Sequence, residues 1–232
     1  LCRFFMGLGA SFGFVCLLVS VHDWMPHKHL AIFIGLSQFI GTLGPMIATG
    51  PLETFAQASA TDWRYTFFLL GMIGLLQVVL IVLFVENNSK TTGPYIILSK
   101  PEKFLPSITR LFSRAQPWYI AIVSTSLYFT IEYLSENEGR AFLELQGISA
   151  SSAAYMLTTS WIGYAVGCPL LGVVSDVLER RKNLLIGCSG LALSSIAAIL
   201  YLPGTSHFQL SFFILGISAA GQSIGFATIS EQ

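Results

Sequence analysis

The sequence predicts an all-α, polytopic membrane protein. Of its 232 residues, 53% are hydrophobic and only 10% are charged, against roughly 25% charged residues in an ordinary soluble domain. Apolar runs of about 20 residues, the length that spans a bilayer as a helix, recur along the chain. Because lipid offers no partner to unpaired backbone groups, such runs must be helical. We expect seven transmembrane helices, near residues 3–21, 30–50, 66–85, 118–135, 152–174, 184–202 and 208–229.

The connections between these runs differ in charge. Three of them, residues 22–29, 86–117 and 175–183, hold nine of the twelve Lys and Arg residues. Cytoplasmic loops of membrane proteins are enriched in these cations. We therefore expect these three connections inside the cell, the start of the chain outside and its end inside.

The longest polar connection divides the chain. Residues 87–117 are rich in Pro and Lys, which makes this segment a poor packing element and a suitable linker between two helix bundles. We expect three helices of one bundle in residues 1–86, and four helices of a second bundle in residues 118–232.

Several motifs carry more specific information. Residues 172–182 read GVVSDVLERRK, a charged turn between two apolar runs. The first run begins R-x-x-x-G-x-G-A at Arg3, the second contains G-T-L-G-P from Gly41, and D-W-R-Y-T-F precedes the third. Together these resemble the major facilitator superfamily, in which a G-x-x-x-D-x-x-x-R-R-K loop follows the second helix of each six-helix half. The resemblance implies a two-bundle fold in which this chain supplies seven of twelve helices, the fourth to the tenth.

In that family the charged loop belongs to the gating machinery. The resemblance therefore makes four loop residues candidates for a conformational latch: Gly172, Asp176, Arg180 and Arg181. We expect Asp176 to cap its own turn and the arginines to pair with Glu231, at the inner end of the last helix. Asp23 holds the corresponding place in the other half. The alternative is that the three cations only fix the topology of the loop.

Two charged residues are candidates for proton coupling. Arg3 lies in an apolar run, where a guanidinium is costly unless it faces a polar cavity or extends to the interface. The resemblance to the fourth-helix arginine favours the cavity. Glu132 ends the fourth run, and a partly desolvated carboxylate there would exchange protons. A solvated cluster with nearby glutamates is the alternative.

Five polar or amphipathic side chains interrupt the apolar runs and are candidates for a substrate cavity: Gln38, Tyr128, Trp161, Tyr164 and Gln222. Glutamine amides need hydrogen-bond partners in lipid, so they should face the bundle interior. They would contact a solute or join helices to one another.

Five further residues are candidates for hinges or close helix packing: Gly44, Pro45, Gly163, Gly167 and Pro169. A proline inside a helix removes a backbone hydrogen bond, which marks a hinge or a fixed kink. Glycines one turn apart let two helix backbones approach closely.

We expect a secondary transporter that moves an amino acid or similar small metabolite by alternating access, driven by protons, in a bacterial inner membrane. An exporter of hydrophobic compounds is one alternative, and a seven-helix receptor is another. The sequence has no nucleotide-binding loop, no metal-ligand spacing and four cysteines that read as small hydrophobes. We expect no catalysis of covalent chemistry, no cofactor, no metal and no nucleic acid. The expected partners are the solute, protons and the lipid bilayer, and we expect a monomer.

Overall fold

The computed structural model describes residues 2–25, 29–48, 63–85, 112–178, 180–202 and 204–230. Helices account for nearly all of these residues, and no strand occurs among them. The all-α fold class predicted from the sequence is therefore confirmed. The linker predicted at residues 87–117 lies mostly outside the described part.

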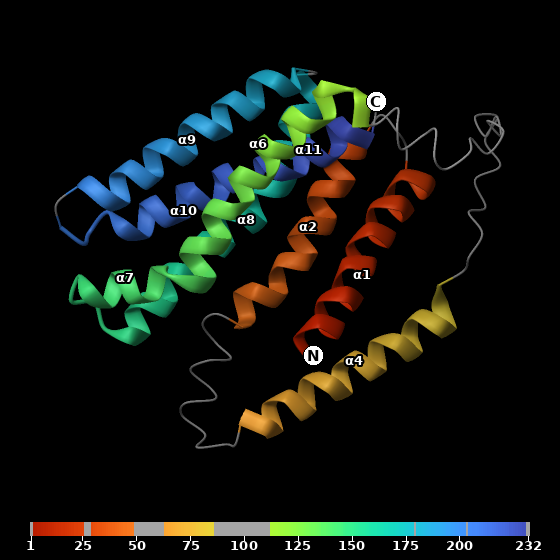
Figure 1. The fold of residues 1–232 in the computed structure, drawn as a ribbon, viewed down its shortest axis with the longest axis horizontal. Helices are drawn as coiled ribbons and strands as arrows, with labels where there is room; N and C mark the ends of the chain where they lie inside the picture. Colours follow the sequence, from red (N-terminus) through yellow and green to blue (C-terminus); the bar gives the residue numbers. More distant parts are fainter. Residues whose placement is uncertain are drawn as a thin grey trace.

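Helices cover most of the described residues in each of the seven expected spans (Figure 1). The helices are α1 (Cys2–Trp24), α2 (Leu30–Ile47), α4 (Trp63–Phe84), α6 (Ala115–Glu132), α7 (Gly139–Leu145), α8 (Ala150–Leu178), α9 (Arg181–Tyr201), α10 (Phe208–Ala219) and α11 (Gly221–Ser230), with a π-helical segment, η3 (Tyr133–Asn137), after α6.

Three features differ from the expectation. The short helix α7 lies in what was expected to be a loop, and it is held by the fully buried side chain of Leu143. The last span is divided at Ala220, where Ser223 N–H bonds back to the Ala220 carbonyl over three residues instead of four. By length and apolarity, six helical segments of the described chain can cross a membrane, counting α10 and α11 as one span. The more polar α6 is not among them.

Helix α8 lies at the centre of the molecule. It packs against α2 on one side and against α10 on the other, with α6 and α11 nearby (Figure 1). The largest buried cluster surrounds Trp161, Tyr164 and Cys168 of α8 and includes residues of α6, α9 and α11. A smaller cluster, which includes Ile34 of α2 and Ala227 of α11, joins α1 and α2 to the last helix. The segments before and after the linker therefore share a packed interface.

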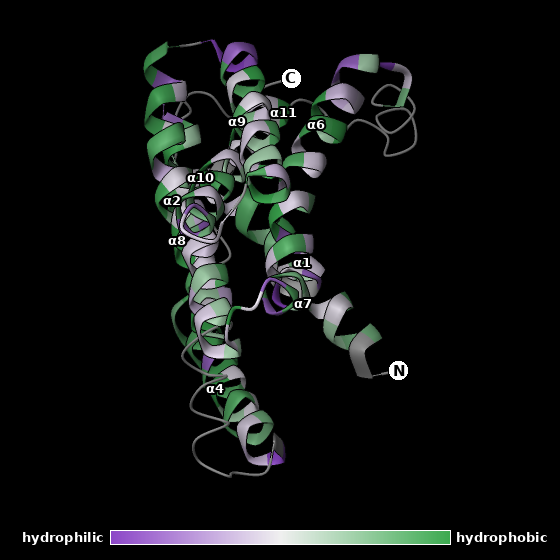
Figure 2. Cartoon of the chain, turned by 90° about the vertical axis from the view of Figure 1, so that its left-hand side faces the viewer, coloured by the Kyte–Doolittle hydropathy of each residue, from purple (hydrophilic) through white to green (hydrophobic). Residues whose placement is uncertain are grey.

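Hydrophobic residues predominate along the helices (Figure 2), and many large apolar side chains are exposed. Phe4 of α1 is 68% exposed and Phe84 of α4 is 76% exposed, and no residue of α4 whose side chain is described is buried. A soluble protein rarely exposes so much contiguous apolar surface. In a bilayer, such surface faces lipid or other helices.

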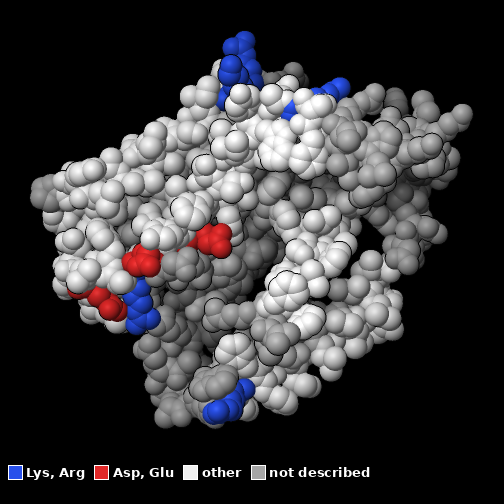
Figure 3. Space-filling view, viewed as in Figure 1, with Lys and Arg blue, Asp and Glu red and all other residues white. Residues whose placement is uncertain are grey.

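On the face seen in Figure 3, Lys and Arg side chains gather along the upper edge, and Asp and Glu side chains gather lower down, with further Lys or Arg groups beside and below them. In the chain, Arg114 comes directly before α6, and Arg180 and Lys182 stand at the start of α9. Glu138 and Glu144 follow the last residues of α6. These charged residues therefore lie near helix ends, as is typical of membrane-spanning segments.

Candidate functional site: a pocket between the two helix groups

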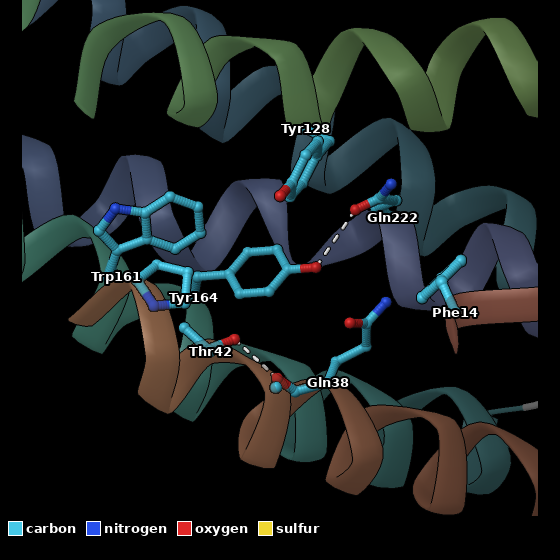
Figure 4. Close-up of a pocket in the computed structure, with 9 residues that line it drawn as sticks. Phe14, Gln38, Thr42, Tyr128, Trp161, Tyr164 and Gln222 are labelled. Atoms are coloured by element: carbon cyan, nitrogen blue, oxygen red, sulfur yellow. Dashed lines mark hydrogen bonds between the residues drawn. The ribbon is translucent and has the colours of Figure 1, made fainter. Parts of the chain in front are cut away.

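A pocket of about 360 Å³ lies between the helices before the linker and those after it (Figure 4). Helices α1, α2, α6, α8 and α11 all contribute to its wall. The lining residues are Phe14, Gln38, Gly41, Thr42, Pro45, Tyr128, Trp161, Tyr164 and Gln222. All five side chains that the sequence singled out as cavity candidates are thus brought together in one pocket. Whether they contact a solute stays a prediction.

The pocket lies at mid-depth. Gln38 occupies the centre of α2 and Tyr164 the centre of α8. Substrate sites of transporters built from two helix repeats are found near the bilayer midplane, at the interface of the repeats. Position and depth therefore match such a site.

Aromatic rings form one wall. Tyr164 packs edge-on against Trp161 at a centroid distance of 6.0 Å and against Tyr128 at 5.9 Å. Trp161 and Tyr164 are each only 2% exposed. Edge-to-face rings at this spacing are favourable, so this wall is rigid and largely apolar.

Polar groups point into the pocket from two sides. The Tyr164 hydroxyl donates to Oε1 of Gln222 at 3.2 Å, while Thr42 donates to the backbone carbonyl of Gln38 at 2.6 Å (Figure 4). Among the described residues, none is hydrogen-bonded to the side-chain amide of Gln38. The buried indole N–H of Trp161 likewise has no partner in this part of the chain. These groups remain available to a bound molecule.

The two coupling candidates lie away from the pocket. Glu132 is exposed at the end of α6, one turn beyond Tyr128, and does not line the pocket. Arg3 precedes Phe14 on α1 by about 16 Å along the helix axis. The side chain of Arg3 lies outside the described part. The proton-coupling role of both residues stays a prediction.

Backbone contact closes one end of the α2–α8 interface. A Cβ on Gly35 would collide with the carbonyl oxygen of Cys168, and one on Gly172 would lie 2.7 Å from the carbonyl oxygen of Ala31. By contrast, a Cβ on Gly41 or Gly44 would meet nothing within 4 Å. The two helices therefore touch backbone to backbone between the pocket and the end that carries Asp176.

Asp176 makes polar contacts to two neighbouring helices at this closed end. Its Oδ2 accepts a hydrogen bond of 3.3 Å from the backbone N–H of Ile32, in the first turn of α2. Its Oδ1 lies 3.9 Å from Nη2 of Arg181, and the two side chains are 7% and 17% exposed. Free N–H groups and the helix dipole make a helix N-terminus a favourable place for a carboxylate. Asp176 thus joins α2, α8 and α9; we call this contact the Asp176 clasp.

The clasp differs from the predicted latch in its partner. Capping of the turn before α9 by Asp176 stays a prediction, while one of its carboxylate oxygens accepts a hydrogen bond at the N-terminus of α2, 144 residues away in sequence. Arg180 is exposed at the start of α9. Glu231 and the side chain of Asp23 lie outside the described residues, so the pairing with Glu231 stays a prediction.

The predicted packing and hinge residues all lie in α2 or α8. A Cβ on Gly163 would collide with the carbonyl oxygen of Phe213, and one on Gly167 would lie 2.8 Å from Cβ of Ala220, so both glycines allow α10 to approach. Pro45 and Pro169 lie inside continuous helices, and neither ends its helix. Motion about Gly44, Pro45 or Pro169 stays a prediction.

Sequence reasoning missed Phe14, Gly41, Thr42 and Gly35. Thr42 is one turn from Gln38 and shares its face, which was a usable signal. Ala31 and Gly35 have the small-xxx-small spacing that predicts close helix packing. Phe14 is an apolar residue in an apolar run, so no local signal distinguishes it.

Within the described ranges, no group of three or more His, Cys, Asp or Glu residues is placed to hold a metal ion. The pocket instead offers amides, hydroxyls and aromatic rings. Membrane-length helices, a mid-depth pocket shared by two helix groups and a charged clasp at one end define a polytopic membrane protein with a central pocket.

Comparison with known proteins gives the family. The sequence model of the major facilitator superfamily matches residues 1–232, the whole chain. The chain belongs to the major facilitator superfamily, and the seven-helix receptor alternative is thereby set aside. It is an integral membrane protein.

Two curated proteins illustrate the relationship. The chain is 23% identical, over 95% of its length, to the inner membrane metabolite transport protein YhjE of Escherichia coli, of which the match covers 52%. It is 29% identical over 38% of its length to an uncharacterized transporter, C36.01c, of Schizosaccharomyces pombe, of which the match covers 15%. The chain thus spans about half the length of YhjE. No solved structure matches the chain.

Proposed function

We propose that this chain forms part of a secondary transporter that moves a small solute across a membrane by alternating access. The central pocket carries the proposal, because its wall comes from helices on both sides of the linker. Motion of one helix group against the other would open such a pocket to either side in turn. We place the bundle boundaries at residues 1–86 and 118–232, with the linker at 87–117.

The end that carries the Asp176 clasp is proposed to be cytoplasmic, because the connections there hold most of the Lys and Arg residues. With the clasp formed and the α2 and α8 backbones in contact, the pocket is closed toward the cytoplasm. In this proposal, the solute would reach the pocket from the outside while the clasp is formed. Release of the clasp would be required for the solute to leave inward.

We further propose that protons drive transport of an amino acid or similar small metabolite, and that the protein resides in a bacterial inner membrane. YhjE is described as an inner membrane metabolite transport protein, which supports a metabolite as the solute and an inner-membrane location. Glu132, one turn from Tyr128, and Arg3 are the candidates for coupling. No catalysis of covalent chemistry is proposed.

Uptake by the complete transporter in proteoliposomes tests this function. Radiolabelled amino acids and small metabolites are offered with and without an imposed inward proton gradient. Accumulation above the equilibrium level only in the presence of the gradient is expected. Equilibration without accumulation would remove the proton from the proposal, and gradient-driven extrusion would favour the exporter. If no solute moves in either direction, the proposed function is wrong.

A further inference from the structure

We infer that the pocket selects an uncharged solute that carries hydroxyl or amide groups and has one apolar face. Gln222 and Gln38 are its hydrogen-bonding residues, and Tyr164 positions Gln222. This inference rests on the proposed transport function and narrows its solutes to uncharged metabolites, which leaves out amino acids because they carry an ammonium and a carboxylate group at neutral pH.

Charge is the first argument. Among the described residues, the nine that line the pocket include no Asp, Glu, Lys, Arg or His. An ion taken from water into such a site, without a partner of opposite charge, loses far more hydration than neutral hydrogen bonds replace. Glu132, at the end of α6, is exposed, and its carboxylate does not line the pocket. The lining residues therefore disfavour carboxylate and ammonium groups.

Hydrogen-bonding capacity is the second argument. The hydroxyl of Tyr164 occupies Oε1 of Gln222, and this bond holds the amide so that its two N–H groups remain to donate. Across the pocket, the amide of Gln38 offers both a donor and an acceptor (Figure 4). A hydroxyl or a primary amide also donates and accepts, so it can satisfy both residues.

The shape of the wall is the third argument. Trp161, Tyr164 and Tyr128 present packed aromatic surface, and Phe14 adds a ring from α1. Such a wall binds an apolar face of a ligand, while amides bind its polar edge. A volume of about 360 Å³ is at the small end of the range of ligand pockets. A small solute with one polar edge and one apolar face fits these limits.

Matched sets of probes test the inference in the complete transporter, reconstituted in proteoliposomes at pH 7. One set is D-glucose, D-glucuronate and D-glucosamine, and the other is succinamide and succinate. Members of a set differ in charge but little in size. Uptake or competitive binding of the uncharged member is expected to exceed that of each charged member by about tenfold or more, because an unpaired buried charge is strongly disfavoured.

Three variants, one of them a control, test which residues select the uncharged solute. Gln222→Glu places a carboxylate in the pocket without changing its size; the expected result is about tenfold weaker use of the uncharged probe and a gain for glucosamine. Gln146→Glu makes the same change at an exposed residue outside the pocket and is expected to behave like the parent. Tyr164→Phe is expected to raise KM and leave kcat unchanged, because the positioning bond to Gln222 is lost.

Each remaining outcome contradicts a defined part of the inference. Preference for a charged member of either set would overturn the uncharged class while the transport function stands. Equal behaviour of Gln222→Glu and Gln146→Glu would overturn the assignment to Gln222. Failure of every probe and of all solutes in the gradient assay would overturn both the inference and the proposed function.

Discussion

Two stretches of the same helix pair differ in how closely they approach. Near the Asp176 clasp, α2 and α8 touch through their backbones at Gly35 and Gly172. One turn further along α2, at Gln38, the same pair contributes to the pocket wall instead. The contrast shows how one interface can both close a path and leave a pocket, because Gly35 and Gly172 meet the facing backbone in the closed stretch, whereas polar and aromatic side chains line the pocket in the open stretch.

The largest effect is expected from filling the closed stretch. In Gly35→Ala, the new Cβ would collide with the backbone of Cys168, which cannot rotate away. Overpacking of this kind typically lowers the free energy of unfolding by about 1–3 kcal/mol, and we expect the thermal midpoint of the complete transporter to fall. Gly44→Ala, on the same helix but with nothing within 4 Å, is the control. Equal midpoints for the two variants would show that the helices are not in backbone contact.

The next effect concerns the Asp176 clasp. Asp176→Asn keeps an acceptor for Ile32 but removes the charge that faces Arg181 and the N-terminus of α2. A carboxylate at a partly buried helix N-terminus contributes up to about 2 kcal/mol. Loss of the Asp176 charge should therefore raise the ratio of inward-open to outward-open protein roughly 5- to 30-fold.

Labelling of Ser175→Cys, a fully buried position beside Asp176, measures that shift. The native cysteines are first replaced, and a membrane-impermeant maleimide is applied from the cytoplasmic side. Labelling should be faster with Asp176→Asn than without it. An unchanged rate would mean that the clasp does not hold the closed state.

A smaller effect is expected in the open stretch. Tyr164→Phe removes one hydrogen bond, which contributes about 0.5–1.5 kcal/mol to stability, so the thermal midpoint should fall slightly, and KM of the transported solute should rise about 2- to 10-fold because Gln222 loses the bond that positions it. Tyr155→Phe, at a 59% exposed position of the same helix, is the matched control. A fall in stability without a change in KM would assign Tyr164 to packing alone.

The smallest effect is expected at the outer surface. Arg140 and Glu144 form an exposed pair at 3.0 Å, one turn apart on α7. Such pairs contribute about 0.3–0.5 kcal/mol, so Glu144→Gln should change the free energy of unfolding by no more than that in a denaturation series. If Glu144→Gln lowered the free energy of unfolding as much as Gly35→Ala, the expectation that this exposed ion pair contributes less than the backbone contact between α2 and α8 would be wrong.

The sequence correctly predicted features that depend on local composition, such as the helical spans and the polar side chains that face the interior. Gln38 and Gln222 were expected to face the interior because an amide is costly in lipid, and both line the pocket. Features that depend on tertiary contact were not predicted. The bond between Asp176 and Ile32 joins residues far apart in sequence, and nothing near Phe14 marks it as a pocket residue. The division of the last span at Ala220 was also not predicted, because no proline or charged residue stands there to indicate a helix break.

The central claim is that α2 and α8 separate at the Asp176 clasp when the pocket opens inward. Spin labels at His29 and Val177, both exposed near the clasp, and at Ile47 and Tyr155, both exposed toward the opposite end, report on it by double electron–electron resonance in the complete transporter. We predict that Asp176→Asn lengthens the first distance and shortens the second. If both distances are the same in Asp176→Asn as in the parent, alternating access about the α2–α8 interface is contradicted.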